Sequence, residues 1–116
     1  MRCVVAIFAH REERRIAACL RSLPLCRPDT EFHLLVNGSN DRTAAIGQEV
    51  ARLHPALTVH DWQPGGKART WNRFVHEVGP ERAGCWIFMD GDAEITTGSI
   101  DALQAAVAQP GVNAAG

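Results

Sequence analysis

The sequence lacks a long apolar run and a surplus of charge, and each absence excludes a class of function. The apolar stretch at residues 3–9 is far shorter than the roughly 18 residues that a transmembrane helix needs, and no cleavable signal pattern follows it. Lys and Arg (12) nearly balance Asp and Glu (13), so a net charge of -1 offers no electrostatic footprint for nucleic acid or anionic lipid. We therefore expect a soluble, cytoplasmic domain with no membrane span, no nucleic-acid partner and a small ligand.

Metal and disulfide motifs are missing as well. The four cysteines form neither a CxxC pair nor the short-spaced framework of secreted proteins. Cys3, Cys19 and Cys85 lie in apolar segments, where a reduced cysteine behaves as a small hydrophobic residue. The five histidines are scattered, without an HExxH motif or a Cys/His cluster, which argues against a zinc site.

What the sequence does contain is an apolar pattern that alternates between two periods. Short continuous apolar segments, typical of buried parallel strands, alternate with segments in which apolar residues recur at helical spacing. Alternating strands and helices indicate right-handed βαβ units, which predict an α/β fold with a mostly parallel sheet between helical layers, a three-layer sandwich. The predicted strands are residues 3–9, 32–36, 57–62 and 85–89, and the helices are marked by Ile16, Leu20 and Leu23, by Ile46, Val50 and Leu53, by Trp71, Phe74, Val75 and Val78, and by Ile100, Leu103 and Val107.

The 116 residues are enough for one domain, and no linker, internal repeat or low-complexity segment divides them. A fifth strand is expected near Val112. In open α/β sheets, ligands bind beyond the carboxyl ends of the strands. The polar residues at the carboxyl ends of the predicted strands should therefore gather along one edge of the sheet. They comprise His10 and Arg11 after Ala9, then Asn37, Asp61, Asp90 and Asp92.

The segment Asp90-Gly91-Asp92 carries the sharpest chemical signal. Side chains two apart on an extended segment point the same way, so both carboxylates should project together from the strand end, with Gly91 leaving space for close approach. A divalent cation would keep two neighbouring carboxylates ionised. The alternative is a loop in which the two acids are solvated or cap the next helix.

Two further segments offer polar groups at the same edge. Gly65 and Gly66 precede Lys67 at the start of a predicted helix, where backbone N–H groups and a mobile positive charge would suit a diphosphate. Asn72 on the same helix would add an amide. A plain turn with a solvated lysine explains the first segment equally well, and residues 37–41 after the second strand fit a turn with a helix cap.

Taken together, four segments resemble the family 2 glycosyltransferases of GT-A fold in order and spacing. The resemblance rests on residues 4–12, 34–41, 65–72 and 86–92, and it covers almost the whole chain. It implies a Rossmann-like, GT-A-type sheet with strand order 3-2-1-4, in which residues 1–116 form the nucleotide-sugar-binding half. It also implies transfer of a sugar from a nucleotide diphosphate donor, such as a UDP- or GDP-sugar, to an unknown acceptor, with Mn²⁺ or Mg²⁺ as cofactor.

By that resemblance, Asp92 is the metal ligand and Asp90 contacts the ribose or a metal-bound water. Ala9, His10 and Glu12 correspond to the nucleoside-binding edge. Asn37 stands where many members carry an aspartate that meets the base or ribose, so the base preference is open. The remaining donor-site residues implied by the resemblance are Lys67, Asn72 and Gly91.

No residue of the chain matches the family's catalytic base, which lies in the second, acceptor-binding half of its members. We therefore expect the isolated chain to transfer no sugar, and a non-catalytic nucleotide-diphosphate-binding module remains the alternative function. A nicotinamide-dependent dehydrogenase would need GxGxxG after the first strand, which is absent. A DxD phosphatase would need its acidic pair after the first strand rather than the fourth.

The fourth strand also predicts self-association. If it has no outer neighbour, its apolar segment with Trp86, Ile87, Phe88 and Met89, free of Lys and Pro, leaves backbone groups and apolar surface open to a second copy. We expect a homodimer or aggregation through this edge.

Overall fold

The computed structural model describes residues 2–63, 65–78 and 84–95, together with residues 100, 102 and 105. Its strands form a single parallel sheet in the order β3-β2-β1-β4, which confirms the predicted class and strand order. The strands are β1 (Cys3–Ala9), β2 (Thr30–Asn37), β3 (Leu57–Trp62) and β4 (Cys85–Asp90).

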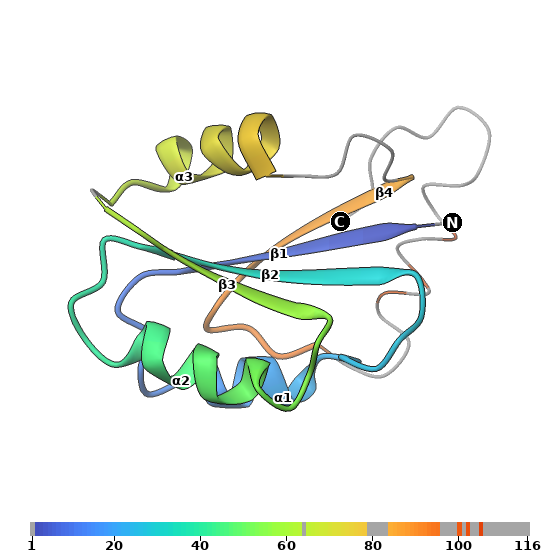
Figure 1. Ribbon diagram of the computed structural model, residues 1–116, viewed down its shortest axis with the longest axis horizontal. Coiled ribbons are helices and arrows are strands. Elements are labelled where there is room, and N and C mark those ends of the chain that lie inside the picture. Colours follow the sequence, from blue (N-terminus) through green and yellow to red (C-terminus); the bar gives the residue numbers. More distant parts are fainter. Residues whose placement is uncertain are drawn as a thin grey trace.

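Helices cover both faces of this sheet (Figure 1). Helices α1 (Ile16–Ser22) and α2 (Thr43–Ala51) lie along one face, and α3 (Lys67–Arg73) lies on the other. Helix α3 continues into a π-helical turn, η1 (Phe74–Val78). The result is the three-layer arrangement that the alternating pattern predicts. No helix in the described part of the chain has both the length and the apolarity to cross a membrane.

Strand β1 is the centre of the core, since all seven of its residues are buried. Its side chains alternate between the two faces: Val5 and Ile7 join the cluster under α1 and α2, while Val4, Ala6 and Phe8 pack with Phe74 under α3 and η1. A strand that is paired on both sides and covered on both faces needs apolar residues at every position, which explains its continuous apolar sequence. The three cysteines predicted to act as apolar residues, Cys3, Cys19 and Cys85, are buried.

Two helices depart from the predicted apolar faces. Helix α2 ends at Ala51, and Leu53 is 79% exposed beyond it, because Pro55 disfavours helical backbone at the preceding residue. In the third helix Phe74 is fully buried but Trp71 is 41% exposed, because the face that packs on the sheet carries Thr70 and Phe74, four positions apart, and Trp71 lies beside that face. The predicted positions Leu103, Val107 and Val112 lie outside the described residues.

Strand β4 pairs with β1 and is an edge of the described sheet. Ile87 and Met89 pack partly against the core under α1 and α2, and Trp86 packs against the opposite core. Phe88 is 41% exposed. The homodimer through this edge stays a prediction.

A histidine pair lies in the core beneath η1. His33 on β2 and His60 on β3 stack at 5.3 Å between ring centroids, with His33 Nδ1 3.1 Å from His60 Nε2, and Phe74 packs 5.0 Å from His33. Burial lowers the pKa of both rings, that of His60 to about 4, where the nearby His33 and Arg73 lower it further. Neutral histidines therefore help to hold α3 and η1 on the sheet.

Candidate functional site

The carboxyl ends of the four strands lie at one edge of the sheet, as the sequence predicts. In the strand register, Ala9 is opposite Val36, Asn37 is opposite Trp62, and Phe8 is opposite Asp90. The loops that follow these strands therefore meet at the same edge. This edge is where an open parallel sheet binds its ligand.

Asn37 and His10 connect the ends of β1 and β2. The side chain of Asn37 is buried, and its Nδ2 donates to the carbonyl of Ala9 at 3.1 Å. His10 Nδ1 lies 2.7 Å from the carbonyl oxygen of Asn37. Because a carbonyl only accepts, Nδ1 carries the hydrogen, so a neutral His10 ring has Nε2 as a bare acceptor. His10 is exposed, so this acceptor is open to a ligand, whereas the Asn37 amide is committed to joining the strands.

The loop after β1 has an unusual backbone that neighbouring hydroxyls stabilise. Arg11 has a φ of +53°, in the left-handed region that non-glycine residues seldom adopt. Its N–H donates to Ser39 Oγ at 2.7 Å, and the next N–H, of Glu12, donates to Thr43 Oγ1 at 2.9 Å. The Glu12 carbonyl then accepts from Arg15 and Ile16 at 2.9 and 2.8 Å, which starts the turn into α1.

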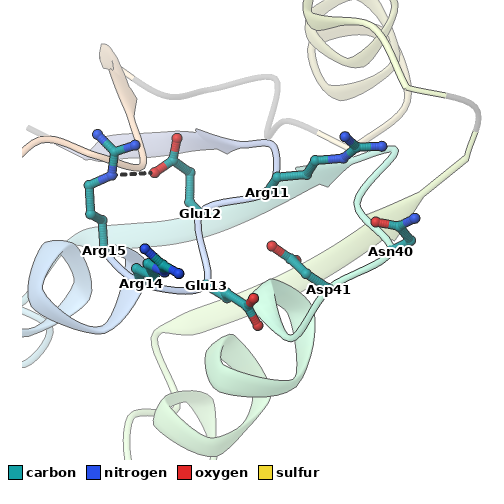
Figure 2. Close-up of a pocket in the computed structure, with 7 residues that line it drawn as sticks. All are labelled: Arg11, Glu12, Glu13, Arg14, Arg15, Asn40 and Asp41. Carbon is teal, nitrogen blue, oxygen red and sulfur yellow. Dashed lines mark ion pairs between the residues drawn. The ribbon is translucent and has the colours of Figure 1, made fainter.

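An open pocket of about 390 Å³ lies between the loops that follow β1 and β2 (Figure 2). Arg15 Nε pairs with Glu12 Oε2 at 3.2 Å, and Arg15 Nη1 lies 3.7 Å from Asp92 Oδ2. Arg15 therefore bridges an acid of the loop after β1 and an acid of the loop after β4. The lining is rich in charges of both signs and consists of Arg11, Glu12, Glu13, Arg14, Arg15, Asn40 and Asp41.

Asp90 and Asp92 do not project together as expected. Strand β4 ends at Asp90, and residues 91 and 92 form a turn in which the Ala93 N–H donates to the Asp90 carbonyl. Asp90 pairs with Lys67 of α3 at 2.7 Å, whereas Asp92 faces Arg15, which precedes α1. The two carboxylates thus contact cations from opposite layers, because the turn ends the extended backbone on which a common direction depends.

Gly91 is needed for packing within the protein. Its N–H donates to the Phe8 carbonyl at 2.8 Å, and an added Cβ would lie 3.1 Å from Ala9 Cβ and 3.3 Å from Ile16 Cδ1. The close approach that Gly91 permits is therefore to β1 and α1. This contact seats the turn that carries Asp92 on the end of the central strand.

Lys67 and Asn72 line a second, mostly apolar hollow of about 490 Å³ on α3, together with Ala68 and Trp71. Lys67 Nζ also lies 5.5 Å from the Phe8 ring centroid. Gly65 packs against Gly38, so close that a Cβ on Gly38 would lie 2.6 Å from Gly65 Cα. These two glycines join the loops after β2 and β3 and bring α3 to the site edge.

Comparison with known proteins identifies the family of this chain. The glycosyl transferase family 2 model matches residues 4–116. The chain belongs to glycosyl transferase family 2. No curated protein sequence gives a significant match.

Solved structures similar to this family 2 chain share its fold. The 1–349 fragment of S. aureus TarS has 21% sequence identity to this chain and a TM-score of 0.72. The match covers 92% of this chain and 32% of the TarS fragment. Mannosyltransferase PcManGT from Pyrobaculum calidifontis, in complex with GDP-Man and Mn²⁺, has 24% sequence identity and a TM-score of 0.73. The match covers 94% of this chain and 33% of PcManGT. These likenesses confirm the GT-A fold, and the chain spans about a third of the length of these structures.

The acidic residues of this family 2 chain fit a cation that is shared with a diphosphate. The described residues contain no group of three or more His, Cys, Asp or Glu side chains placed to hold a metal by themselves. Mg²⁺ in nucleotide sites needs only one or two carboxylates, because phosphates and waters complete its coordination. Asp90 and Asp92 are 61% and 48% exposed and are held by exposed ion pairs, which contribute little and break easily.

Two residues outside the segments that resemble the family, Arg15 and Thr43, also shape this edge of the sheet. Arg15 contacts Asp92, and the Thr43 hydroxyl accepts from the Glu12 N–H. A hydroxyl residue seven positions after the predicted strand end is a weak signal, since Ser and Thr are common near helix starts. The predicted donor-site roles of Ala9, His10, Glu12, Asn37, Lys67, Asn72, Asp90, Gly91 and Asp92 remain predictions.

Proposed function

We propose that this chain is the nucleotide-sugar-binding part of a glycosyltransferase that uses a UDP- or GDP-sugar donor with Mn²⁺ or Mg²⁺. Family membership over residues 4–116 supports a transferase. The observation that carries the proposal is the meeting of Glu12, Arg15 and Asp92, from two separate loops, at the carboxyl edge of the sheet. PcManGT, similar in fold, is in complex with GDP-Man and Mn²⁺, and TarS 1–349 has been solved in complex with UDP.

In this proposal Asp92 is the carboxylate that binds the cation, and Asp90 contacts the ribose or a cation-bound water. The cation, when bound, would neutralise the charge that develops on the departing diphosphate. Asp92 is available for this role because its contact with Arg15 is long, at 3.7 Å, and nearly half of its side chain is exposed. When Asp92 turns to the cation, Arg15 keeps its shorter contact with Glu12.

The remaining polar groups would contact the nucleoside and the diphosphate. The exposed His10 Nε2 would accept a hydrogen bond from a base N–H or a ribose hydroxyl, since its Nδ1 hydrogen is held by Asn37. Lys67 would contact the diphosphate. In the structure its Nζ pairs instead with Asp90 Oδ1 at 2.7 Å. Asn72, two residues after the buried Thr70 and on the exposed side of α3, would be a further contact from the same helix.

Isothermal calorimetry with UDP and GDP tests this function. We expect either nucleotide to bind in Mn²⁺ and to lose most of its affinity in chelator or when Asp92→Asn is introduced. Asp29→Asn is the matched control, because it removes one exposed acidic charge just before β2, at the edge of the sheet opposite the site. Equal binding in chelator, or metal-dependent binding that survives Asp92→Asn, would show that Asp92 is not the metal ligand.

A further inference from the structure

Two loops of the site edge are joined through consecutive backbone N–H groups. The N–H of Arg11 donates to Ser39 Oγ at 2.7 Å, and the N–H of Glu12 donates to Thr43 Oγ1 at 2.9 Å. Arg11 is held at a φ of +53°, a conformation that costs a non-glycine residue energy and persists only when its surroundings impose it. The hydroxyls of Ser39 and Thr43 help to impose this conformation, because they accept from the N–H groups of Arg11 and Glu12.

The hydroxyl of Thr43 has a defined direction. Thr43 is fully buried, and its hydroxyl donates to Asp41 Oδ1 at 2.6 Å while the Thr43 N–H donates to the same oxygen at 3.0 Å. With its hydrogen committed to Asp41, the hydroxyl oxygen is an acceptor for the Glu12 N–H. Removal of the hydroxyl would leave the Glu12 N–H without this acceptor, whereas the partly exposed Asp41 would keep the Thr43 N–H as a donor.

The position of the Glu12 carboxylate follows from this backbone. Its Oε2 is a buried atom without a hydrogen bond among the described residues, and it lies 3.2 Å from Arg15 Nε in an ion pair. Arg15 in turn faces Asp92. A shift of the Glu12 backbone would therefore move the carboxylate and the arginine that connect the first loop to the proposed metal ligand.

We propose that Thr43 and Ser39 are positioning residues of the donor site, whose hydroxyls hold the Arg11–Glu12 backbone so that Glu12 meets the nucleotide. This inference rests on the proposed function. Neither residue touches the ligand in this scheme, and each acts through the loop it braces. The chain offers a built-in comparison in Thr30, which is also buried, lies at the opposite end of β2, and donates its hydroxyl to the Pro28 carbonyl at 3.3 Å.

The test compares Thr43→Val, Thr43→Ser and Thr30→Val by calorimetric titration with UDP and GDP in Mn²⁺, at a temperature where melting curves show each variant to be folded. Thr43→Val is expected to weaken nucleotide binding about tenfold or more, because a buried N–H loses its acceptor. Thr43→Ser keeps the hydroxyl and should bind within about threefold of the unaltered chain. Thr30→Val should lower the melting temperature without changing affinity.

Ser39→Ala is the second variant, for the case that Thr43→Val does not fold. It removes only the acceptor of the Arg11 N–H from a half-buried side chain, and it should weaken binding roughly three- to tenfold. Affinity unchanged in both Thr43→Val and Ser39→Ala would overturn the proposal. So would an equal loss in Thr30→Val, since that would reveal general destabilisation.

Amide hydrogen exchange measured by NMR separates this inference from the proposed function. Thr43→Val should speed exchange of the Glu12 N–H, and Ser39→Ala should speed exchange of the Arg11 N–H, each at least about tenfold relative to the same amide in Thr30→Val. Unchanged exchange would refute the bracing itself. If the unaltered chain binds neither nucleotide in Mn²⁺, the proposed function fails, and the exchange result still decides whether the hydroxyls hold the loop.

Discussion

The stability of this domain should fall as the pH drops from 7.5 to 5, because of the histidine pair beneath η1. Burial depresses the pKa of His60 to about 4 in the folded protein, against 6.5 for the exposed ring, and lowers the pKa of His33 as well. As the pH falls, the unfolded chain takes up a proton on His60 before the folded protein does. The stabilisation of the folded protein by the neutral His60 ring is therefore complete above about pH 6.5 and is lost progressively between pH 6.5 and pH 4.

The magnitude follows from the difference between the two pKa values. For a single group with these values, the free energy of unfolding at pH 5 is about 2 kcal/mol lower than at pH 7.5. Partial solvent exposure of His60 screens the effect, so we expect a loss of roughly 1–2 kcal/mol from this residue. Glu31, 3.5 Å from His33, partly offsets the loss by favouring a charged His33 ring.

Urea denaturation at pH 7.5, 6.5, 5.5 and 5.0 measures this effect. His60→Gln should unfold more readily at pH 7.5 but lose roughly 1–2 kcal/mol less than the unaltered chain on going to pH 5. His76→Gln is the control, since His76 is exposed on η1 and the variant should keep the original pH dependence. If His60→Gln and the unaltered chain respond equally to pH, the histidine pair does not couple stability to protonation.

Two further predictions concern the loops at the site edge. Gly38→Ala should lower the free energy of unfolding by about 2 kcal/mol or more, because Gly38 has a φ of +65° and an added Cβ would lie 2.6 Å from Gly65 Cα. The loss would appear as a lower urea midpoint, and an unchanged midpoint would contradict the close contact between the two glycines. His10→Gln, which can place an amide oxygen near the ring Nε2 position, should retain more UDP or GDP affinity than His10→Asn, which preserves only the donor to the Asn37 carbonyl. Equal affinities of the two His10 variants, measured by calorimetry, would refute an acceptor role for Nε2.

The burial of the strands could be predicted from sequence because it depends on local periodicity. The continuous apolar residues of 3–9 identify a strand covered on both faces, and β1 occupies the centre of the sheet with no exposed residue. The bounds of β1 and β3 match the prediction, and β2 and β4 extend beyond it by residues such as Thr30 and Asp90. The exact ends of strands are harder to predict from the apolar pattern, because backbone pairing continues past the last apolar side chain.

The family and its fold were also accessible from sequence, since the four polar segments follow strand ends in a specific order. Parallel strands bring these ends to one edge, so the topology alone places His10, Asn37 and Asp90 near one another. Local sequence does not, however, determine where the side chains of a motif point. A motif such as Asp90-Gly91-Asp92 specifies residue types but does not specify the backbone turn that aims them.

Only the tertiary structure decided which groups the acidic side chains meet. The turn at residues 91 and 92 directs Asp92 to Arg15, and the packing of α3 brings Lys67 to Asp90 from 23 positions away. The Glu12 backbone depends in the same way on Thr43, which is 31 positions distant. Such contacts leave no periodic trace in the sequence, because they are set by how layers and loops pack in three dimensions rather than by the local conformation of either partner.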